Sequence, residues 1–382
     1  MPIDVSAVPC STYTPDVCRR SLEQVLKPLG GLNWVQPGMR VAIKANLVAG
    51  MAPERAATTH PALLLALTQL LLERGAHVVI GDSPGGLYNA AFVERIYKAA
   101  GLYPVEAAGA ELNRNFTQAQ AVYPQARVAR TFQYTQYLAE ADAIIDFCKL
   151  KSHGMMGMSA AAKNLFGAIP GTLKPEYHFR FPDPRDFARM IVDLDEYFHP
   201  IVSIADAVVA MEGNGPTQGT PRPIGALLAS SSPHKLDLAC AWLIGLERNQ
   251  VPTLEAALER GLIPPHVSEL QIAGELETFR ILDFQKLETP SSLLFRGRGE
   301  STWGKLQGAV IQRLLSARPE ASAQCIGCGK CAGLCPAKAI AMTNGRPRIR
   351  RSQCIHCFCC QEFCPVGAMQ VRRTAIARML NR

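Results

Sequence analysis

Eight cysteines near the end of the chain follow one spacing pattern that occurs twice. Both copies read C-x2-C-x2-C-x3-C-P, the first over residues 325–336 and the second over residues 354–365. This run is typical of bacterial proteins that hold two 4Fe-4S clusters. The two-residue gaps let a tight loop wrap three thiolates around one cubane, whereas the fourth thiolate lies beyond that loop and crosses to the other cluster. The spacing therefore predicts two clusters with exchanged fourth ligands.

The crossing pattern divides the cysteines into two ligand sets and leaves one neighbour out. We expect the sets to be Cys325, Cys328, Cys331 and Cys364 for one cluster, and Cys335, Cys354, Cys357 and Cys360 for the other. Cys359 adjoins a ligand but falls off the spacing, so it is assigned to neither set. The repeated motif indicates a duplicated half-module within a small α+β ferredoxin-like domain.

The positive charge of the chain is concentrated around this cysteine-rich segment. Residues 321–382 contain ten Lys or Arg and one acid, Glu362, so their net charge is +9 within a whole-chain value of +8. Four thiolates around a 2+ core carry about −2, so two clusters would lower the local charge to about +5. Such a module could dock an acidic redox partner of the ferredoxin or flavodoxin type, or its basic residues could simply offset the cluster charges. No aromatic stripe accompanies these residues, so nucleic-acid binding is not expected.

Length and composition are those of a soluble globular protein with more than one domain. At 382 residues, two domains are the prior expectation. The first residues lack a charged segment followed by an apolar one, so no secretory signal is expected. The longest apolar stretch, residues 62–72, is too short to cross a bilayer, which predicts no membrane span. Eight of the thirteen cysteines fall in the cluster motifs, which favours a reducing cytoplasm over a disulfide framework.

The first three quarters of the chain alternate between strand-like and helix-like segments. Strands are expected over 39–46, 76–82, 143–148, 201–206 and 225–230, and helices over 16–29, 60–75, 88–101, 159–166 and 185–198. Short apolar strands between amphipathic helices predict an α/β fold with a mainly parallel sheet covered by helices. We expect this domain over residues 1–285, a connector over 286–320 with a helix near 307–315, the ferredoxin-like module over 321–372 and a basic tail over 373–382.

Polar residues follow several of the predicted strands. Lys44 and Asn46 lie at the end of the first strand and Asp82 at the end of the second. Asp206 is the last residue of the strand predicted over 201–206. In an open parallel sheet, ligands bind outside the carboxyl ends of the strands. We therefore expect these side chains to converge on a binding site, although strand ends that emerge into solvent also carry polar residues.

The segment that follows Cys148 concentrates cations and imidazoles among glycines. Its polar residues are Lys149, Lys151, His153, Lys163, Asn164, Lys174 and His178. Glycines allow close backbone approach, so a carboxylate, a phosphate or a flavin-type cofactor fits such a place. We expect Lys151, His153 and Lys163 to be catalytic, because lysines hold an anion and a histidine exchanges protons near neutral pH.

A second candidate is the glycine-rich loop over residues 211–219. We interpret it as a binding loop, with a tight structural turn as the alternative. The full set of expected cofactor-binding residues is Lys44, Asn46, Asp82, Asn164, Asp206, Gly213, Asn214 and Gly215. The chain has no Walker A sequence and no GxGxxG, so ATP or NAD binding in a standard mode is not supported.

Five separated segments of the large domain form a recognisable series. They are residues 41–47, 75–83, 149–153, 162–167 and 211–216. In this order they resemble the domain of unknown function 362 family, which often carries a two-cluster ferredoxin-like module. The resemblance covers roughly residues 1–285. It implies an iron–sulfur redox protein of undefined substrate and supplies no catalytic residues.

Two functions are consistent with these residues. The first is a cytoplasmic iron–sulfur oxidoreductase in which two 4Fe-4S clusters relay electrons to or from a small anionic substrate or a flavin-type cofactor in the α/β domain. The second is a non-enzymatic electron carrier or accessory subunit that docks a partner redox enzyme. A concave site with clustered Lys and His favours the first, whereas an exposed surface with a hydrophobic centre favours the second.

Overall fold

The computed structural model describes residues 2–286 and 318–372. Within them, a nine-stranded sheet forms the centre of the large domain in the order β11-β1-β10-β9-β7-β2-β3-β4, with β8 paired onto β7. Its strands are β1 (Val5–Pro9), β2 (Arg40–Ala45), β3 (His77–Gly81), β4 (Glu111–Leu112), β7 (Ala143–His153), β8 (Gly157–Ser159), β9 (Val202–Glu212), β10 (Thr220–Ser230) and β11 (Ile272–Ala273). The strands from β9 to β4 pair in parallel, while β10 runs antiparallel between β9 and β1. The mainly parallel sheet confirms the predicted fold class.

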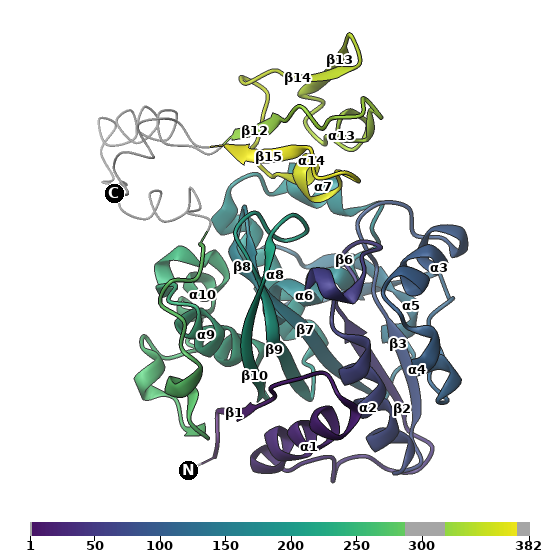
Figure 1. The fold of residues 1–382 in the computed structure, drawn as a ribbon, viewed down its shortest axis with the longest axis vertical. Helices are drawn as coiled ribbons and strands as arrows, with labels where there is room; N and C mark the ends of the chain where they lie inside the picture. The colour runs from purple at the N-terminus through teal and green to yellow at the C-terminus, as the bar shows by residue number, and fades with distance from the viewer. Residues whose placement is uncertain (1, 287–317, 373–382) are drawn as a thin grey trace.

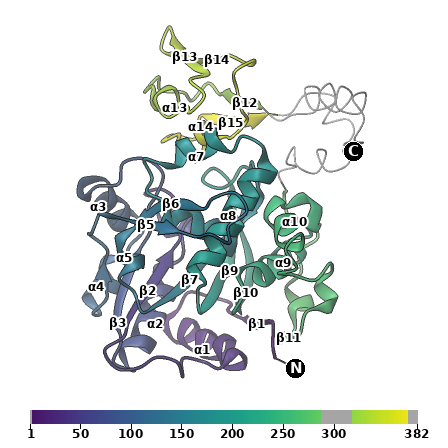
Figure 2. The ribbon, with the colours of Figure 1, turned by 180° about the vertical axis from the view of Figure 1, so that it is seen from behind.

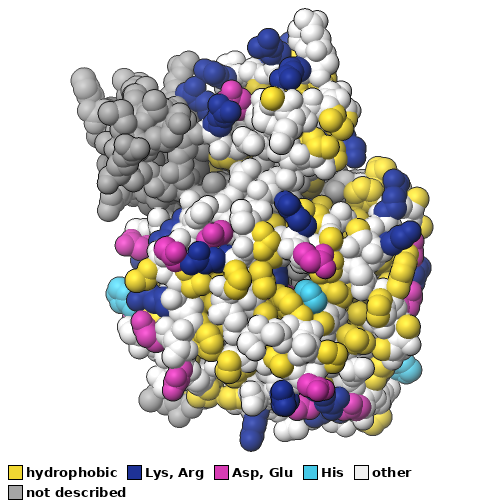
Figure 3. All heavy atoms as spheres, in the orientation of Figure 1, with side chains coloured by type: hydrophobic (Ala, Val, Ile, Leu, Met, Phe, Trp, Pro, Cys, Tyr) yellow, Lys and Arg dark blue, Asp and Glu magenta, His cyan; other side chains and the backbone are white. Residues whose placement is uncertain are grey.

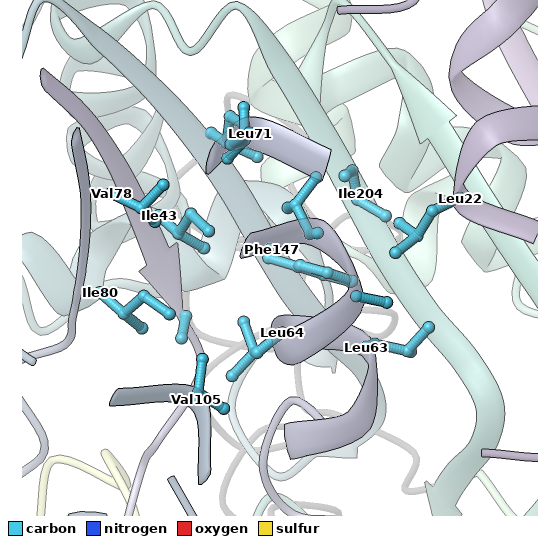
Figure 4. Close-up of a cluster of buried hydrophobic side chains, with 14 of the residues drawn as sticks. Leu22, Ile43, Leu63, Leu64, Leu71, Val78, Ile80, Val105, Phe147 and Ile204 are labelled. Atoms are coloured by element: carbon cyan, nitrogen blue, oxygen red, sulfur yellow. The ribbon is translucent and has the colours of Figure 1, made fainter. Parts of the chain in front are cut away.

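Helices cover both faces of this sheet (Figure 1, Figure 2). On one face lie α1 (Pro15–Leu26), α2 (Pro61–Leu72), α3 (Ala90–Ala99) and α4 (Tyr103–Ala107). On the other lie α5 (Gln136–Ala139), α6 (Ala161–Leu165), α7 (Lys174–Arg180), α8 (Pro184–Phe198), α9 (Pro233–Leu243) and α10 (Pro252–Leu258), with the hairpin of β5 (Gln118–Val122) and β6 (Thr131–Thr135). In the first layer, Leu22 of α1 and Leu63 of α2 share a buried cluster with Phe147 of β7 (Figure 4).

Local sequence signals explain where these helices begin. The helices α1, α2, α8, α9 and α10 each start with a proline, whose missing N–H is not needed in the first turn. Side-chain caps satisfy other free amides. His60 Nδ1 accepts a hydrogen bond from the Ala62 N–H at 3.2 Å, and Asp183 accepts one from Arg185 at 2.9 Å. The predicted helices over 60–75 and 185–198 therefore begin at Pro61 and Pro184.

Three strands are longer than the sequence indicates, and one of them is β10, which begins at Thr220 and not at Gly225. The prediction that the strand after Ala143 ends at Cys148 was wrong, because β7 continues to His153. The short strand β8 pairs with this extension and matches Lys151 to Ser159, which supplies the backbone hydrogen bonds that prolong it. Likewise β9 extends to Glu212, so the predicted binding loop is the tip of the β9–β10 hairpin.

The module consists of two small antiparallel sheets and two short helices. Its elements are β12 (Arg318–Ala321), α13 (Lys330–Gly333), β13 (Ile340–Thr343), β14 (Arg346–Ile349), α14 (Cys359–Glu362) and β15 (Met369–Arg372). β12 pairs with β15, and β13 pairs with β14. Left-handed backbone conformations recur at equivalent places in the two cysteine motifs, in the pairs Gly327 and His356, Gly329 and Phe358, and Lys338 and Gly367. The backbone thus repeats as the duplicated motif predicts.

Two features of the sequence analysis concern other parts of the chain. The helix expected near 307–315 and the basic tail over 373–382 lie outside the described residues. Among the helices of the described ranges, none combines the length and apolarity needed to cross a bilayer.

Candidate functional site

A small cavity lies at the carboxyl ends of β2, β3 and β7, where the module meets the large domain. Its volume is about 40 Å³, enough for roughly three water molecules or an anion of a few atoms. Polar and charged residues of the large domain line it, among them Asn46, Asp82, Lys151, His153, Lys163 and Lys174. Glu362 and Phe363 of the module complete its wall. Both parts of the chain therefore build one site.

A buried ion pair occupies one side of this cavity. Lys44 Nζ lies 2.9 Å from Asp82 Oδ1 and 3.1 Å from Asn164 Oδ1. The second oxygen of Asp82 accepts the Leu47 N–H at 2.7 Å. Asn164 Nδ2 donates to Asp146 Oδ1, also at 2.7 Å. Protein contacts therefore engage Lys44, Asp82 and Asn164, which fix the strand ends around the cavity.

Lys151 is anchored by the residues that surround it. Its Nζ donates to Asn46 Oδ1 at 2.8 Å and to the Ala57 carbonyl at 2.6 Å. Asn46 in turn donates to Asn164 Oδ1 at 2.9 Å. Burial lowers the pKa of Lys151 to about 7, and the nearby Glu362 opposes the shift only in part. An anion bound beside this amine would stabilise its protonated form near neutral pH.

Two further lysines lie over the ring of Phe166. Lys163 Nζ is 4.7 Å from the ring centroid, and Lys174 Nζ is 5.7 Å from it. Burial lowers the pKa of both side chains, that of Lys174 to about 8. Lys174 donates a hydrogen bond to the Ser83 carbonyl. Within the described residues, Lys163 Nζ makes neither a hydrogen bond nor an ion pair, so it is the lysine free to bind an anion.

His153 presents a hydrogen-bond donor to the same cavity. Its Nδ1 accepts the N–H groups of Met155 at 3.1 Å and Met156 at 3.3 Å, which places the proton of the neutral ring on Nε2. Nε2 has no partner among the described residues. Burial and the neighbouring Lys163 lower the pKa of His153 well below its usual value. The imidazole is therefore neutral and offers an N–H to a ligand.

The charges around the cavity do not cancel. Asp82 already pairs with Lys44. The three other lysines of the cavity then face only one carboxylate, that of Glu362. A buried charge without a partner is costly, so bound anions stabilise an arrangement of this kind. The geometry and the charge both fit a small anion.

The second cysteine loop of the module attaches it to the large domain. Gln361 is fully buried, and its Nε2 donates to the carbonyls of Asn214 at 3.0 Å and Gly215 at 3.2 Å. Phe358 is 3% exposed and belongs to a hydrophobic cluster of the large domain. In Figure 1 the helix α14 accordingly lies directly above the large domain, beside α7. The module packs against the large domain through the segment that carries its second motif.

The structure brings most of the predicted site residues to this cavity, but not all. Those that line it are Asn46, Asp82, Lys151, His153, Lys163 and Asn164, and Lys44 lies behind Asp82. Asp206 lies elsewhere, 2.8 Å from Lys149 Nζ, and it accepts a hydrogen bond from the Tyr13 hydroxyl at 2.9 Å. Gly213, Asn214 and Gly215 do not line the cavity, and the last two contact Gln361.

The sequence analysis did not anticipate the contribution of the module to the cavity. Glu362 and Phe363 stand where the first cysteine motif has Gly333 and Leu334. This difference between two copies of one repeat was a usable signal, because a charged and an aromatic residue have replaced small or aliphatic ones next to ligand positions. It marks the second copy as the one with an additional role.

A larger hollow lies on another part of the boundary between module and large domain. Its volume is about 560 Å³, and Arg55, Asn214, Gln218 and Val366 are among its lining residues. Ligands the size of a flavin occupy pockets of roughly 300–1,000 Å³. This hollow contains none of the three cavity lysines, so the predicted catalytic residues and a flavin-sized space are separate.

The cysteines of the first expected ligand set lie around one hollow of the module. One hollow of about 20 Å³ within the module is surrounded by Cys325, Cys328, Cys331 and Cys364. In the second set, burial raises the pKa of the Cys354 thiol, and the nearby Cys357 and Cys335 raise it further. Within the described ranges, no three His, Cys, Asp or Glu side chains converge as ligands of a single ion would. The four thiolates that hold a 4Fe-4S cluster are separated by the width of the cluster, so they do not converge on a single point. Four cysteines around one hollow provide these four ligands.

Fold and site together define an α/β protein with a ferredoxin-type module joined to a cation-rich cavity. Residues 41–242 match the family described as domain of unknown function (DUF362), and residues 320–365 match the 4Fe-4S dicluster domain. The chain therefore belongs to the DUF362 family, as its five sequence segments predict, and it carries a 4Fe-4S binding domain.

Two known proteins show how far this similarity extends. A thylakoid-associated protein of Synechocystis is 34% identical over 268 residues, which are 68% of this chain and 80% of that protein. The lactate racemase apoprotein from Thermoanaerobacterium thermosaccharolyticum has a TM-score of 0.42 at 12% identity. That comparison covers 65% of this chain and 58% of the racemase, and it is too distant to inform function.

Proposed function

We propose that this chain is a cytoplasmic iron–sulfur oxidoreductase that binds a small anion in the lysine-rich cavity and changes its oxidation state. Two 4Fe-4S clusters, when bound, supply one-electron oxidation and reduction. We assign them to the two cysteine sets of the sequence analysis. One observation carries the proposal. Glu362 and Phe363 form a wall of the cavity and lie between Cys360 and Cys364, which belong to different sets.

Four residues of the cavity have different roles in binding the anion. Lys163 lies over the Phe166 ring but makes neither a hydrogen bond nor an ion pair within the described residues, and it supplies the charge that attracts the anion. Lys151 is held in place by Asn46 and supplies a second charge. His153 donates its Nε2–H and, being buried beside cations, stays neutral while it does so. Phe363 closes the module side and excludes water, which strengthens each of these interactions.

The size and shape of the cavity support this proposal over the alternatives. A volume of about 40 Å³ suits a phosphate-sized or short carboxylate anion better than a flavin. If the α/β domain served only to dock a partner enzyme, an exposed surface with a hydrophobic centre would be expected on that domain. This cavity is instead concave and lined by cations.

The test is anion binding to the full chain, purified and loaded with iron and sulfide without oxygen. Inorganic phosphate, bicarbonate and short 2-oxo acids are titrated by calorimetry, and the electron paramagnetic resonance of the reduced protein is recorded with and without each. We expect at least one of them to bind and to perturb the spectrum. Binding should be lost in Lys163→Met and kept in Lys98→Met, which removes an exposed lysine of α3. No binding by any of these anions, or equal binding by both variants, would contradict the proposal.

A further inference from the structure

The two cysteine motifs share a backbone but differ in their surroundings. In the second motif, Phe358, Cys359 and Cys360 are 3%, 1% and 7% exposed. In the first motif, Cys328 is exposed and Ile326 is 64% exposed. One half of the duplicated module therefore packs against the large domain and its cavity, while the other half points to solvent.

Apolar side chains surround the solvent-facing cysteines. Ile326, Met342 and Val366 are 64%, 36% and 40% exposed, and all three line the hollow that Cys325, Cys328, Cys331 and Cys364 surround. Large apolar side chains exposed together mark interaction sites more often than those exposed singly. We call the surface formed by Ile326, Met342 and Val366 the outer face.

The surface of the module carries an excess of positive charge. Seven of its basic residues are exposed, and within the described ranges only Arg372 among them forms an ion pair; the other six are Lys330, Lys338, Arg346, Arg348, Arg350 and Arg351. Two acids occur in the described part of the module. Glu320 lies 3.6 Å from Arg372, and Glu362 faces the cavity. In Figure 3 dark-blue side chains accordingly gather on the module at the top of the molecule.

Basic residues accompany both copies of the cysteine motif, at different positions in each. Two clusters of equal charge would call for similar compensation in both motifs. The first motif is accompanied by Lys330 and Lys338, whereas the equivalent positions of the second hold Cys359 and Gly367. The second motif in turn is preceded by Arg350 and Arg351, where the equivalent positions of the first hold Ala321 and Ser322, so both halves of the module carry added positive charge.

We propose that the outer face docks an acidic one-electron carrier protein. An apolar centre with a polar rim is the usual composition of a protein interface, and a basic rim steers an acidic partner to it. Exposed Cys328 lets such a partner approach the first ligand set closely. This inference rests on the proposed function, because it makes the outer half of the module the entry for electrons and the inner half the side that faces the cavity.

The test uses the full chain loaded with iron and sulfide, and an acidic 2Fe-2S ferredoxin as the probe. Binding is measured by biolayer interferometry over a salt series, without any turnover. We expect the affinity to fall about tenfold or more between low and high salt. Ile326→Glu should weaken binding roughly tenfold, and so should Arg348→Glu. Val122→Glu and Arg20→Glu are the matched controls, since Val122 is 66% exposed and both residues lie on the large domain.

The outcomes separate this inference from the proposed function. Small-anion affinity is measured on the same variants and should stay unchanged in all four. Iron content should stay unchanged in Arg348→Glu and in both controls, and Ile326→Glu enters the comparison only with full iron content, because Ile326 lines the hollow of the first ligand set. If the ferredoxin does not bind, or binds all four variants equally, the docking inference is overturned while the anion site stands. Tighter binding of a single-stranded oligonucleotide that displaces the ferredoxin would also overturn it, because the basic surface would then serve a different partner.

Discussion

The ring of Phe363 packs so closely on Gly85 that a Cβ atom at Gly85 would fall 1.6 Å from Phe363 Cε1. Gly85 follows β3 in the large domain, whereas Phe363 directly precedes Cys364 in the module. Both residues also line the lysine-rich cavity. The contact that seats the module is therefore also part of the wall of the proposed site.

This relationship predicts that Gly85→Ala loosens the module. The new methyl group cannot share space with the Phe363 ring, and overpacking of this kind costs about 1–3 kcal/mol. Hydrogen exchange of α14 should become faster, while the core strands β2 and β7 keep their protection. The control is Gly333→Ala, where a Cβ meets nothing within 4 Å. Unchanged exchange in Gly85→Ala would show that the ring does not hold the module.

Removing the unpartnered lysine should separate stability from binding. Lys163→Met deletes a partly buried charge that lacks a protein partner among the described residues. We expect the free energy of unfolding to rise by about 1 kcal/mol and the affinity for inorganic phosphate to fall roughly tenfold or more. Denaturant unfolding and calorimetry check the two effects. A less stable variant with normal phosphate affinity would contradict the role assigned to Lys163.

Anion binding should weaken as the pH rises. The pKa values of Lys151, about 7, and Lys174, about 8, lie below the usual lysine value. Both amines are charged below these values and lose their protons above them, so an anion binds best at the lower pH. We expect the affinity to fall roughly ten- to hundredfold from about pH 6 to about pH 9. Lys151→Met should flatten the part of the curve near pH 7, and an affinity that increases with pH would refute the assignment.

Cysteine variants should distinguish ligands from the neighbour that falls off the spacing. Cys335→Ser should damage the cluster that we assign to Cys354, Cys357 and Cys360, because the spacing predicts that the Cys335 thiolate crosses to that set. About half of the iron should then be lost. Cys359→Ala should keep all of it. Iron analysis and electron paramagnetic resonance check both variants, and damage to the Cys325 cluster alone in Cys335→Ser would reverse the crossing assignment.

A buried acid outside the cavity should limit stability at neutral pH. Neither oxygen of Asp195 has a hydrogen-bond partner among the described residues, and burial raises its pKa well above the usual value. The unfolded chain ionises this group from about pH 4 upward, whereas burial disfavours the ionised form in the folded chain. The free energy of unfolding that is lost to this group therefore grows as the pH rises. Asp195→Asn should therefore be more stable by about 1 kcal/mol at pH 7, with the difference shrinking toward pH 4. Exposed Asp16→Asn should change little, and a destabilised Asp195→Asn would show that the contact with His234, whose Nδ1 lies 3.8 Å from Asp195 Oδ2, stabilises the fold.

Much of the fold could be read from local patterns. The helical spacing of apolar residues predicted the helices over 60–75 and 185–198. In the structure these helices begin at Pro61 and Pro184, each preceded by a side-chain cap. Strand ends were harder to locate. The end of β7 depends on β8, which returns and pairs with it, and such a return leaves no local mark in the sequence of β7 itself.

The sequence by itself determined the duplicated motif and the alternation of strands and helices, and it predicts the two cysteine sets, because each depends on spacing along a short stretch of chain. Only the tertiary structure decided which lysine faces the cavity. Lys149 and Lys151 are two residues apart on one face of β7, yet Asp206 of β9 neutralises the first while the second lies beside Asn46 and Glu362. Their local patterns are alike. Partners from distant segments give one residue an ion pair and place the other at the cavity.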